Sequence, residues 1–172
     1  MASKAQFEIQ ADQVDIKDLW RALTKDKVEF LEKAAPDLLT ELRILEGDGI
    51  GLGSLIFVSF VPYGAGAAPA VLEPFKERIV EYDETKHLLS FLGVEGGYMN
   101  LGFTRYLVSF KLDDIGAGKI LITSSLAYDL EQNFDGAQLL DGFLKLLRYY
   151  LESVVKYLQK LKTDQETNEG RL

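Results

Sequence analysis

The feature that most constrains the fold is a succession of six strand-like segments that precedes one long helical segment. The six segments are rich in β-branched and aromatic residues, and glycine-rich or charged turns separate them. Turns as short as Asp83–Lys86 and Asp113–Gly118 predict antiparallel hairpins between neighbouring strands, and therefore a meander. The six predicted strands are Leu38–Leu45, Ser54–Pro62, Phe75–Tyr82, His87–Val94, Tyr98–Leu112 and Lys119–Leu130.

The C-terminal segment predicts one long amphipathic helix. Its apolar residues recur at steps of three and four without an intervening proline, which is the spacing of a single buried face. About 25 such residues form a helix of roughly 37 Å. The stripe consists of Leu140, Phe143, Leu147, Tyr150, Val154, Leu158 and Leu161. The polar segment Lys162–Leu172 is expected to be a disordered tail.

The N-terminal segment adds one strand and two short helices. Gln6–Gln13 alternates apolar and polar residues, which predicts a half-buried strand. Val14–Leu23 has helical spacing with Asp15 as its cap, and Lys25–Ala34 predicts a second helix that ends before Pro36. Together the pattern predicts an α+β fold, in which a seven-stranded curved antiparallel sheet wraps around the long helix in a single domain over residues 1–161.

Composition excludes several classes of function. The 172 residues include no cysteine, which removes disulfides and thiolate metal sites, so we expect no metal or other cofactor and a cytoplasmic location. The net charge of −8 disfavours nucleic acid as a partner. No apolar run approaches the ~20 residues of a membrane span, so no membrane partner is expected. We expect a monomer or a weak dimer.

The segment Glu46–Gly53 is a glycine-rich loop between two predicted strands. A dinucleotide-binding fingerprint would need a helix directly after it, but Leu55–Val61 is β-rich, and no Gly-Lys-Ser or Gly-Lys-Thr marks a P-loop. Two interpretations remain, a structural turn with positive φ angles and an anion-binding loop, and the first is favoured.

A curved sheet that grips a single helix often leaves space between them, which commonly holds a ligand. The alternative is a core filled by side chains. An interior with no pocket above roughly 300 Å³ would contradict a binding role.

The order of elements, with the loop between the second and third strands, resembles the class-10 pathogenesis-related proteins, the birch pollen allergen family. Gly47–Pro62, Lys76-Glu77-Arg78 and Val94–Tyr106 (VEGGYMNLGFTRY) are most similar to the norcoclaurine synthase branch. The resemblance covers roughly residues 5 to 161. Ile50 departs from it as an extra residue in the loop.

That branch condenses dopamine with an aldehyde, and uses a tyrosine, a glutamate, a lysine and an aspartate that face the cavity. The resemblance places Phe75 and Glu77 at the first two positions, and Leu89 and Val108 at the lysine and aspartate positions. Since Leu and Val cannot titrate or donate, the substitutions argue against norcoclaurine synthase activity.

Glu77 is therefore the tentative catalytic residue and a candidate ligand partner, because a carboxyl that faces an apolar cavity has a raised pKa. The alternative is an ion pair with a neighbouring Arg or Lys. His87, the one histidine, is a weaker candidate base. The expected wall consists of Phe75, Glu77, Leu89, Phe91, Tyr98, Tyr106, Val108, Phe110, Phe143, Leu147 and Tyr150.

Two classes of function stay open. The favoured one is a binding protein for an amphipathic or apolar plant metabolite of phenolic, hormone or alkaloid type, in keeping with a defence-related family. The other is a cofactor-free lyase, cyclase or isomerase of specialised alkaloid or phenolic metabolism that lacks the lysine and aspartate of the branch.

Overall fold

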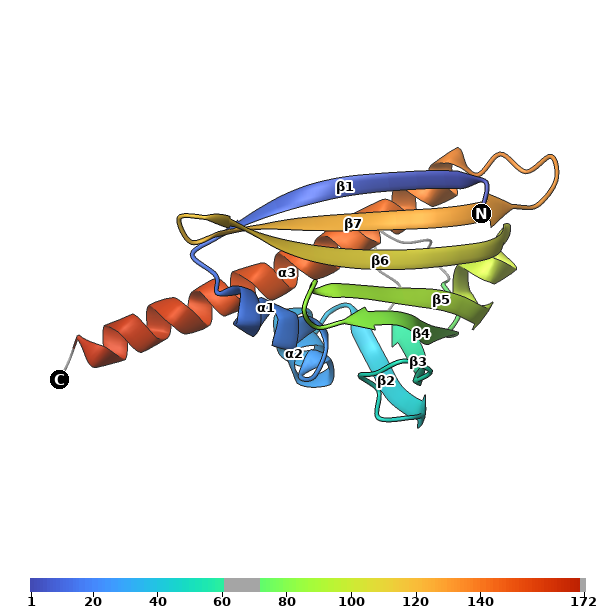
Figure 1. The fold of residues 1–172 in the computed structure, drawn as a ribbon. Helices are drawn as coiled ribbons and strands as arrows, with labels where there is room; N and C mark the ends of the chain where they lie inside the picture. The colour runs from blue at the N-terminus through green and yellow to red at the C-terminus, as the bar shows by residue number, and fades with distance from the viewer. Residues whose placement is uncertain (61–71, 171–172) are drawn as a thin grey trace.

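The computed structural model describes residues 1–60 and 72–170, which form one seven-stranded antiparallel sheet and three α-helices. The predicted α+β fold is confirmed, with the long helix α3 lying along the curved sheet (Figure 1). The strands are β1 (Ser3–Asp12), β2 (Leu39–Glu46), β3 (Leu55–Phe60), β4 (Phe75–Asp83), β5 (Leu88–Gly96), β6 (Phe103–Gly116) and β7 (Lys119–Leu130).

The sheet has the order β1-β7-β6-β5-β4-β3-β2. Strands β2 to β7 thus form the predicted meander, and β1 pairs with β7 over its whole length. The two edge strands, β1 and β2, are neighbours in the strand sequence but lie at opposite ends of the sheet. The helices α1 (Ile16–Leu23) and α2 (Lys27–Ala34) connect them. Asp15 caps α1 as predicted, and its carboxylate accepts from the backbone N–H of Lys17 at 2.8 Å.

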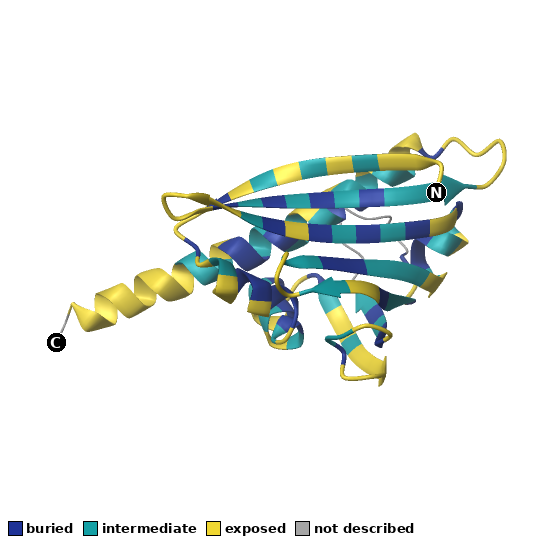
Figure 2. Ribbon diagram, viewed as in Figure 1, coloured by how far each residue is buried: buried dark blue, intermediate teal, exposed yellow. Residues whose placement is uncertain are grey.

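Helix α3 runs from Ala137 to Glu169 and is longer than predicted. The expected disordered tail from Lys162 is helical as far as Glu169, because this segment contains no proline and its first glycine, Gly170, caps the helix. The residues from 160 to 170 are exposed all round, so this part of α3 extends past the sheet (Figure 2). Residues 171–172 lie outside the described residues.

Two strand predictions were wrong in detail. The predicted strand Tyr98–Leu112 begins only at Phe103, because Gly96 and Gly97 take φ angles of +81° and +53° and turn the chain into a 3₁₀ turn over Gly97–Asn100. The predicted turn Asp113–Gly118 is shorter, since β6 continues to Gly116. The end of the strand predicted to reach Pro62 lies outside the described residues.

The hydrophobic core lies between the inner face of the sheet and α3 and continues to α1 and α2. Alternating burial along β6 and β7 directs every second side chain to this core, as expected for strands with one covered face. Helix α3 contributes Phe143, Leu146, Leu151, Val154 and Val155. The cavity described next is the part of this interface that the side chains leave unfilled.

Candidate functional site

A cavity of about 100 Å³ lies between β2 to β6, α2 and the first half of α3. Its wall is apolar except for one carboxyl, one amine and three tyrosine hydroxyls. The lining residues are Lys27, Leu31, Leu42, Ile56, Val58, Phe60, Phe75, Glu77, Phe91, Tyr98, Tyr106, Val108, Phe110, Phe143, Leu146, Leu147 and Tyr150.

The cavity is smaller than the sequence-based expectation. Its volume lies below the roughly 300 Å³ of an ordinary ligand pocket, and even below the roughly 150 Å³ of a cavity known to hold a benzene ring. The large aromatic side chains in its wall account for the difference, since Phe75, Phe91 and Phe110 fill space that smaller residues would leave open. By the criterion of roughly 300 Å³ given above, this conformation of the cavity contradicts binding to a preformed pocket. A ligand as large as a phenolic ring binds only if some of these side chains move.

Ten of the eleven expected wall residues line the cavity. The exception is Leu89, which is 1% exposed and belongs to the packed core. The position of the family lysine therefore holds a core residue here, outside the residues that line this cavity. The sequence did not indicate Lys27, Leu31, Leu42, Ile56, Val58, Phe60 and Leu146, most of which form the wall on the side of α2, β2 and β3.

Glu77, the third residue of β4, lines the cavity and has no charged partner among the described residues. Its neighbours point to the opposite face of the strand, where Lys76 pairs with Glu95 and Arg78 pairs with Glu46. Among the described residues, none donates a hydrogen bond or an ion pair to the Glu77 carboxyl, so the expected alternative of a salt bridge was wrong. Burial raises the pKa of Glu77 to about 8.

The tyrosines near Glu77 are held by close packing. Tyr98 stacks on Phe143 with ring centroids 3.9 Å apart, and its buried hydroxyl has no hydrogen-bond partner among the described residues. The ring of Tyr106 lies across Gly93, where a Cβ atom would come within 2.3 Å of its Cε1. Gly93 is also the pairing partner of Glu77. Burial raises the pKa of Tyr98, Tyr106 and Tyr150, so all three stay neutral donors.

His87 does not reach the cavity. It lies in the turn before β5 with a φ of +52°, and its ring packs against Trp20 at a centroid distance of 5.3 Å. Register shifts in β4 place Glu77 opposite Gly93, beyond the position near residue 90 that simple counting predicts. His87 therefore packs beside α1 and has no part in the cavity.

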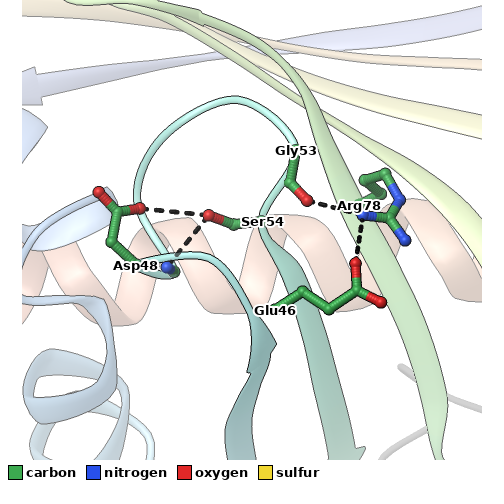
Figure 3. A network of polar contacts seen from close by, with 6 residues as sticks. Glu46, Asp48, Gly53, Ser54 and Arg78 are labelled. Carbon is green, nitrogen blue, oxygen red and sulfur yellow. Dashed lines mark hydrogen bonds and ion pairs between the residues drawn. The ribbon is translucent and has the colours of Figure 1, made fainter.

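The glycine-rich loop is a structural turn that binds its own carboxylate. The Asp48 carboxylate accepts the backbone N–H of Ile50 and of Gly51, both at 2.8 Å. It also accepts a hydrogen bond from the Ser54 hydroxyl (Figure 3). These bonds lower the pKa of Asp48. Because Asp48 already occupies these two backbone donors, the loop does not present them to an external anion.

Lys27 begins α2 and is one of the residues that line the cavity. The residue is 6% exposed, and its Nζ donates to the carbonyl oxygen of Gly49 in the glycine-rich loop. Burial lowers the pKa of Lys27 to about 8, and the charge of Asp48 opposes this shift. The cavity therefore contains one cationic group in addition to the carboxyl of Glu77.

Within residues 1–60 and 72–170, no three histidine or acidic side chains cluster in a way that could hold a metal ion. Over the same residues, no helix has the length and apolar character needed to cross a membrane.

Comparison with known proteins relates this arrangement to plant proteins. No protein-family model matches the chain. Norbelladine synthase of Narcissus pseudonarcissus is 29% identical over 133 residues, which cover 77% of this chain and 75% of that protein. The chain spans 57% of the norcoclaurine synthase of Thalictrum flavum subsp. glaucum, at 30% identity.

Solved structures agree with the fold. The X-ray structure of norcoclaurine synthase from Thalictrum flavum has a TM-score of 0.74 at 23% identity and covers 91% of this chain and 86% of that one. The crystal structure of Ara h 8.0201 also has a TM-score of 0.74, at 17% identity, and covers 92% of this chain and 99% of that one.

The fold and its cavity define a helix-grip protein, in which a curved sheet holds one long helix over an apolar interior. The chain is therefore similar in sequence to norbelladine and norcoclaurine synthases, and it has the Bet v 1-like fold.

Proposed function

We propose that this protein binds an amphipathic or apolar plant metabolite of phenolic, hormone or alkaloid type in the cavity between the sheet and α3. The observation that carries the proposal is a pair of polar groups in an apolar wall that have no partner among the described residues, the half-buried carboxyl of Glu77 and the buried hydroxyl of Tyr98. A buried polar group without a partner costs about 1–3 kcal/mol, and a ligand that hydrogen-bonds to it offsets that cost.

The size of the cavity limits the ligand. A volume of about 100 Å³ fits less than one aromatic ring without rearrangement. We therefore expect the first ring of a ligand to displace wall side chains such as Phe75 or Phe91, and larger ligands to bind more weakly unless more of the wall moves.

The experiment is a titration with an apolar fluorescent probe and its displacement by a planar phenolic. Saturable binding with one probe per chain is expected, and Val108→Phe, which places a larger side chain in the wall, should weaken it at least tenfold. Val80→Phe is the matched control, because Val80 lies on β4 and is exposed. The absence of saturable binding, or equal binding by both variants, would contradict the proposal.

A second candidate function is a cofactor-free lyase, cyclase or isomerase. The observation that favours it is the pKa of Glu77 near 8, which keeps the carboxyl protonated at pH 7 as a potential general acid beside tyrosine donors. Leu89 and Val108 cannot supply the lysine and aspartate chemistry of norcoclaurine synthases. Incubation with a panel of amines, aldehydes and phenolics, read by mass spectrometry, separates the two functions. We expect no condensation of dopamine with 4-hydroxyphenylacetaldehyde above background.

A further inference from the structure

Lys27 is the one ionisable residue in the cavity wall that the proposed function leaves without a role. The rest of the wall consists of apolar side chains, three neutral tyrosines and the Glu77 carboxyl. Since the pKa of Glu77 is about 8, that carboxyl is mostly protonated at pH 7. The pKa of Lys27 is also about 8, so in most molecules its side chain keeps the ammonium charge at pH 7. The cavity therefore carries a net positive charge at neutral pH.

This ammonium has no carboxylate in contact among the described residues. None of the ion pairs of the described residues includes Lys27, and the nearby Asp48 carboxylate is hydrogen-bonded to the backbone N–H groups of its own loop. The contact with the Gly49 carbonyl oxygen uses one of the three donors of the ammonium group. A buried charge is stable only when it is paired and hydrogen-bonded, so an anion is the missing partner.

We propose that the Lys27 end of the cavity is a subsite for the carboxylate of an apolar organic acid. This inference rests on the proposed function, because it assigns a head group to the ligand of the same cavity. A carboxylate supplies the charge and the acceptors that Lys27 lacks, and the aromatic wall that begins at Phe75 and Phe91 accommodates the apolar body. A neutral carbonyl group on the ligand would stabilise the ammonium less than a carboxylate, because the Gly49 carbonyl already accepts one hydrogen bond from it.

A carboxylate is favoured over a larger anion by the geometry. One lysine contributes the positive charge, and the cavity of about 100 Å³ leaves little room for a tetrahedral, doubly charged group. The protonated Glu77 does not repel the ligand at pH 7, whereas the negative charge of the molecule as a whole disfavours multiply charged anions.

The test compares two ligands that differ only in the head group, 3-phenylpropanoate and 3-phenylpropanol, by calorimetric titration of the full chain at pH 7. The acid should bind about tenfold more tightly than the alcohol, as one charge-assisted hydrogen bond provides. Lys27→Met keeps the apolar stem and removes the charge, so it should abolish this preference, and acid and alcohol should bind the variant with similar affinity. Lys25→Met is the matched control, because Lys25 is exposed two residues away.

The outcomes separate the two proposals. Equal binding of acid and alcohol by the native chain overturns the carboxylate subsite and leaves ligand binding intact. Binding of neither ligand overturns both. If Lys27→Met still prefers the acid, a group other than Lys27 binds the ligand carboxylate, and the inference is overturned. A measurement on the native chain does not depend on the variant: NMR titration of the Lys27 side chain should show a higher pKa with the acid bound and no change with the alcohol.

Discussion

Glu77 and Lys27 face the same cavity, and burial moves the pKa of each to about 8 from opposite sides. The pKa of the Glu77 carboxyl rises above neutral pH, so this group takes up a proton and loses its charge. The same shift leaves the ammonium still charged at pH 7. One physical cause thus gives two different results, and the interior of an acidic protein holds a cation that forms no ion pair with the described residues.

The largest expected effect comes from removing the titration of Glu77. Between pH 4.5 and pH 8 the folded protein keeps a proton on Glu77 that the unfolded chain releases, so the free energy of unfolding falls as pH rises through this window. The shift corresponds to at most about 5 kcal/mol. Glu77→Gln should remove this loss and be more stable than the native chain at pH 8, as measured by urea denaturation at pH 5, 6.5 and 8.

The control for this variant is Glu95→Gln. Glu95 lies on β5, its side chain is 62% exposed, and it pairs with Lys76 at the surface. It should keep the pH dependence of the native chain. If Glu77→Gln and Glu95→Gln show the same pH profile, burial does not raise the pKa of Glu77 and the comparison with Lys27 fails.

Lys27 should give a smaller effect in the opposite pH direction. Between pH 8 and pH 10.5 the unfolded chain keeps a proton that folded Lys27 has lost, so stability rises with pH. Below pH 8 Lys27 is charged in the folded state, so the full free-energy cost of burying its ammonium is present. Lys27→Met should therefore stabilise the protein at pH 7 by at most about 3 kcal/mol, reduced by the loss of the bond to Gly49. Urea denaturation should show a smaller stability gain for Lys27→Met at pH 10.5 than at pH 7. Lys25→Met should show no stability gain at either pH.

The smallest effect should follow from Gly93→Ala, which disturbs the Glu77 end of the cavity and not the Lys27 end. The new methyl group collides with the ring of Tyr106, and such overpacking costs about 1–3 kcal/mol. Gly51→Ala is the control, because its Cβ would meet only the Asp48 carboxylate oxygens, at 3.7 and 3.9 Å. ¹³C NMR of the carboxyl groups should show a changed pKa for Glu77 in the first variant. An unchanged Tyr106 ring and stability would contradict the packing described above.

The sequence predicts most of the fold because its elements carry strong local patterns. Strand β7 has the bounds that alternation indicates, and the apolar stripe of α3 lies on its buried face. The failures lie where local pattern and backbone geometry diverge. Tyr98-Met99 has the apolar character of a strand, but the positive φ angles of Gly96 and Gly97 end β5 before it.

The site is predictable on the sheet and less so elsewhere. Strand parity and the helix stripe place Glu77, Phe91 and Phe110 correctly, since those periodicities fix which face a side chain takes. Lys27 could not be found in this way. It stands beside Lys25 and Asp26 at the charged start of a short helix, and only the packing of α2 against the glycine-rich loop decides that Lys27 is buried while Lys25 is exposed.

The strand order has a consequence for how copies of this protein behave toward one another. An open sheet leaves unpaired N–H and C=O groups along its outer strands, and such rows are templates for intermolecular pairing and aggregation. Both outer strands are rich in charge: β1 carries Lys4, Glu8 and Asp12, and β2 carries Glu41, Arg43 and Glu46. Pairing two copies along either strand would bring these charges together, and the net charge of −8 adds a general repulsion. Charge therefore protects the two edges that the fold leaves open.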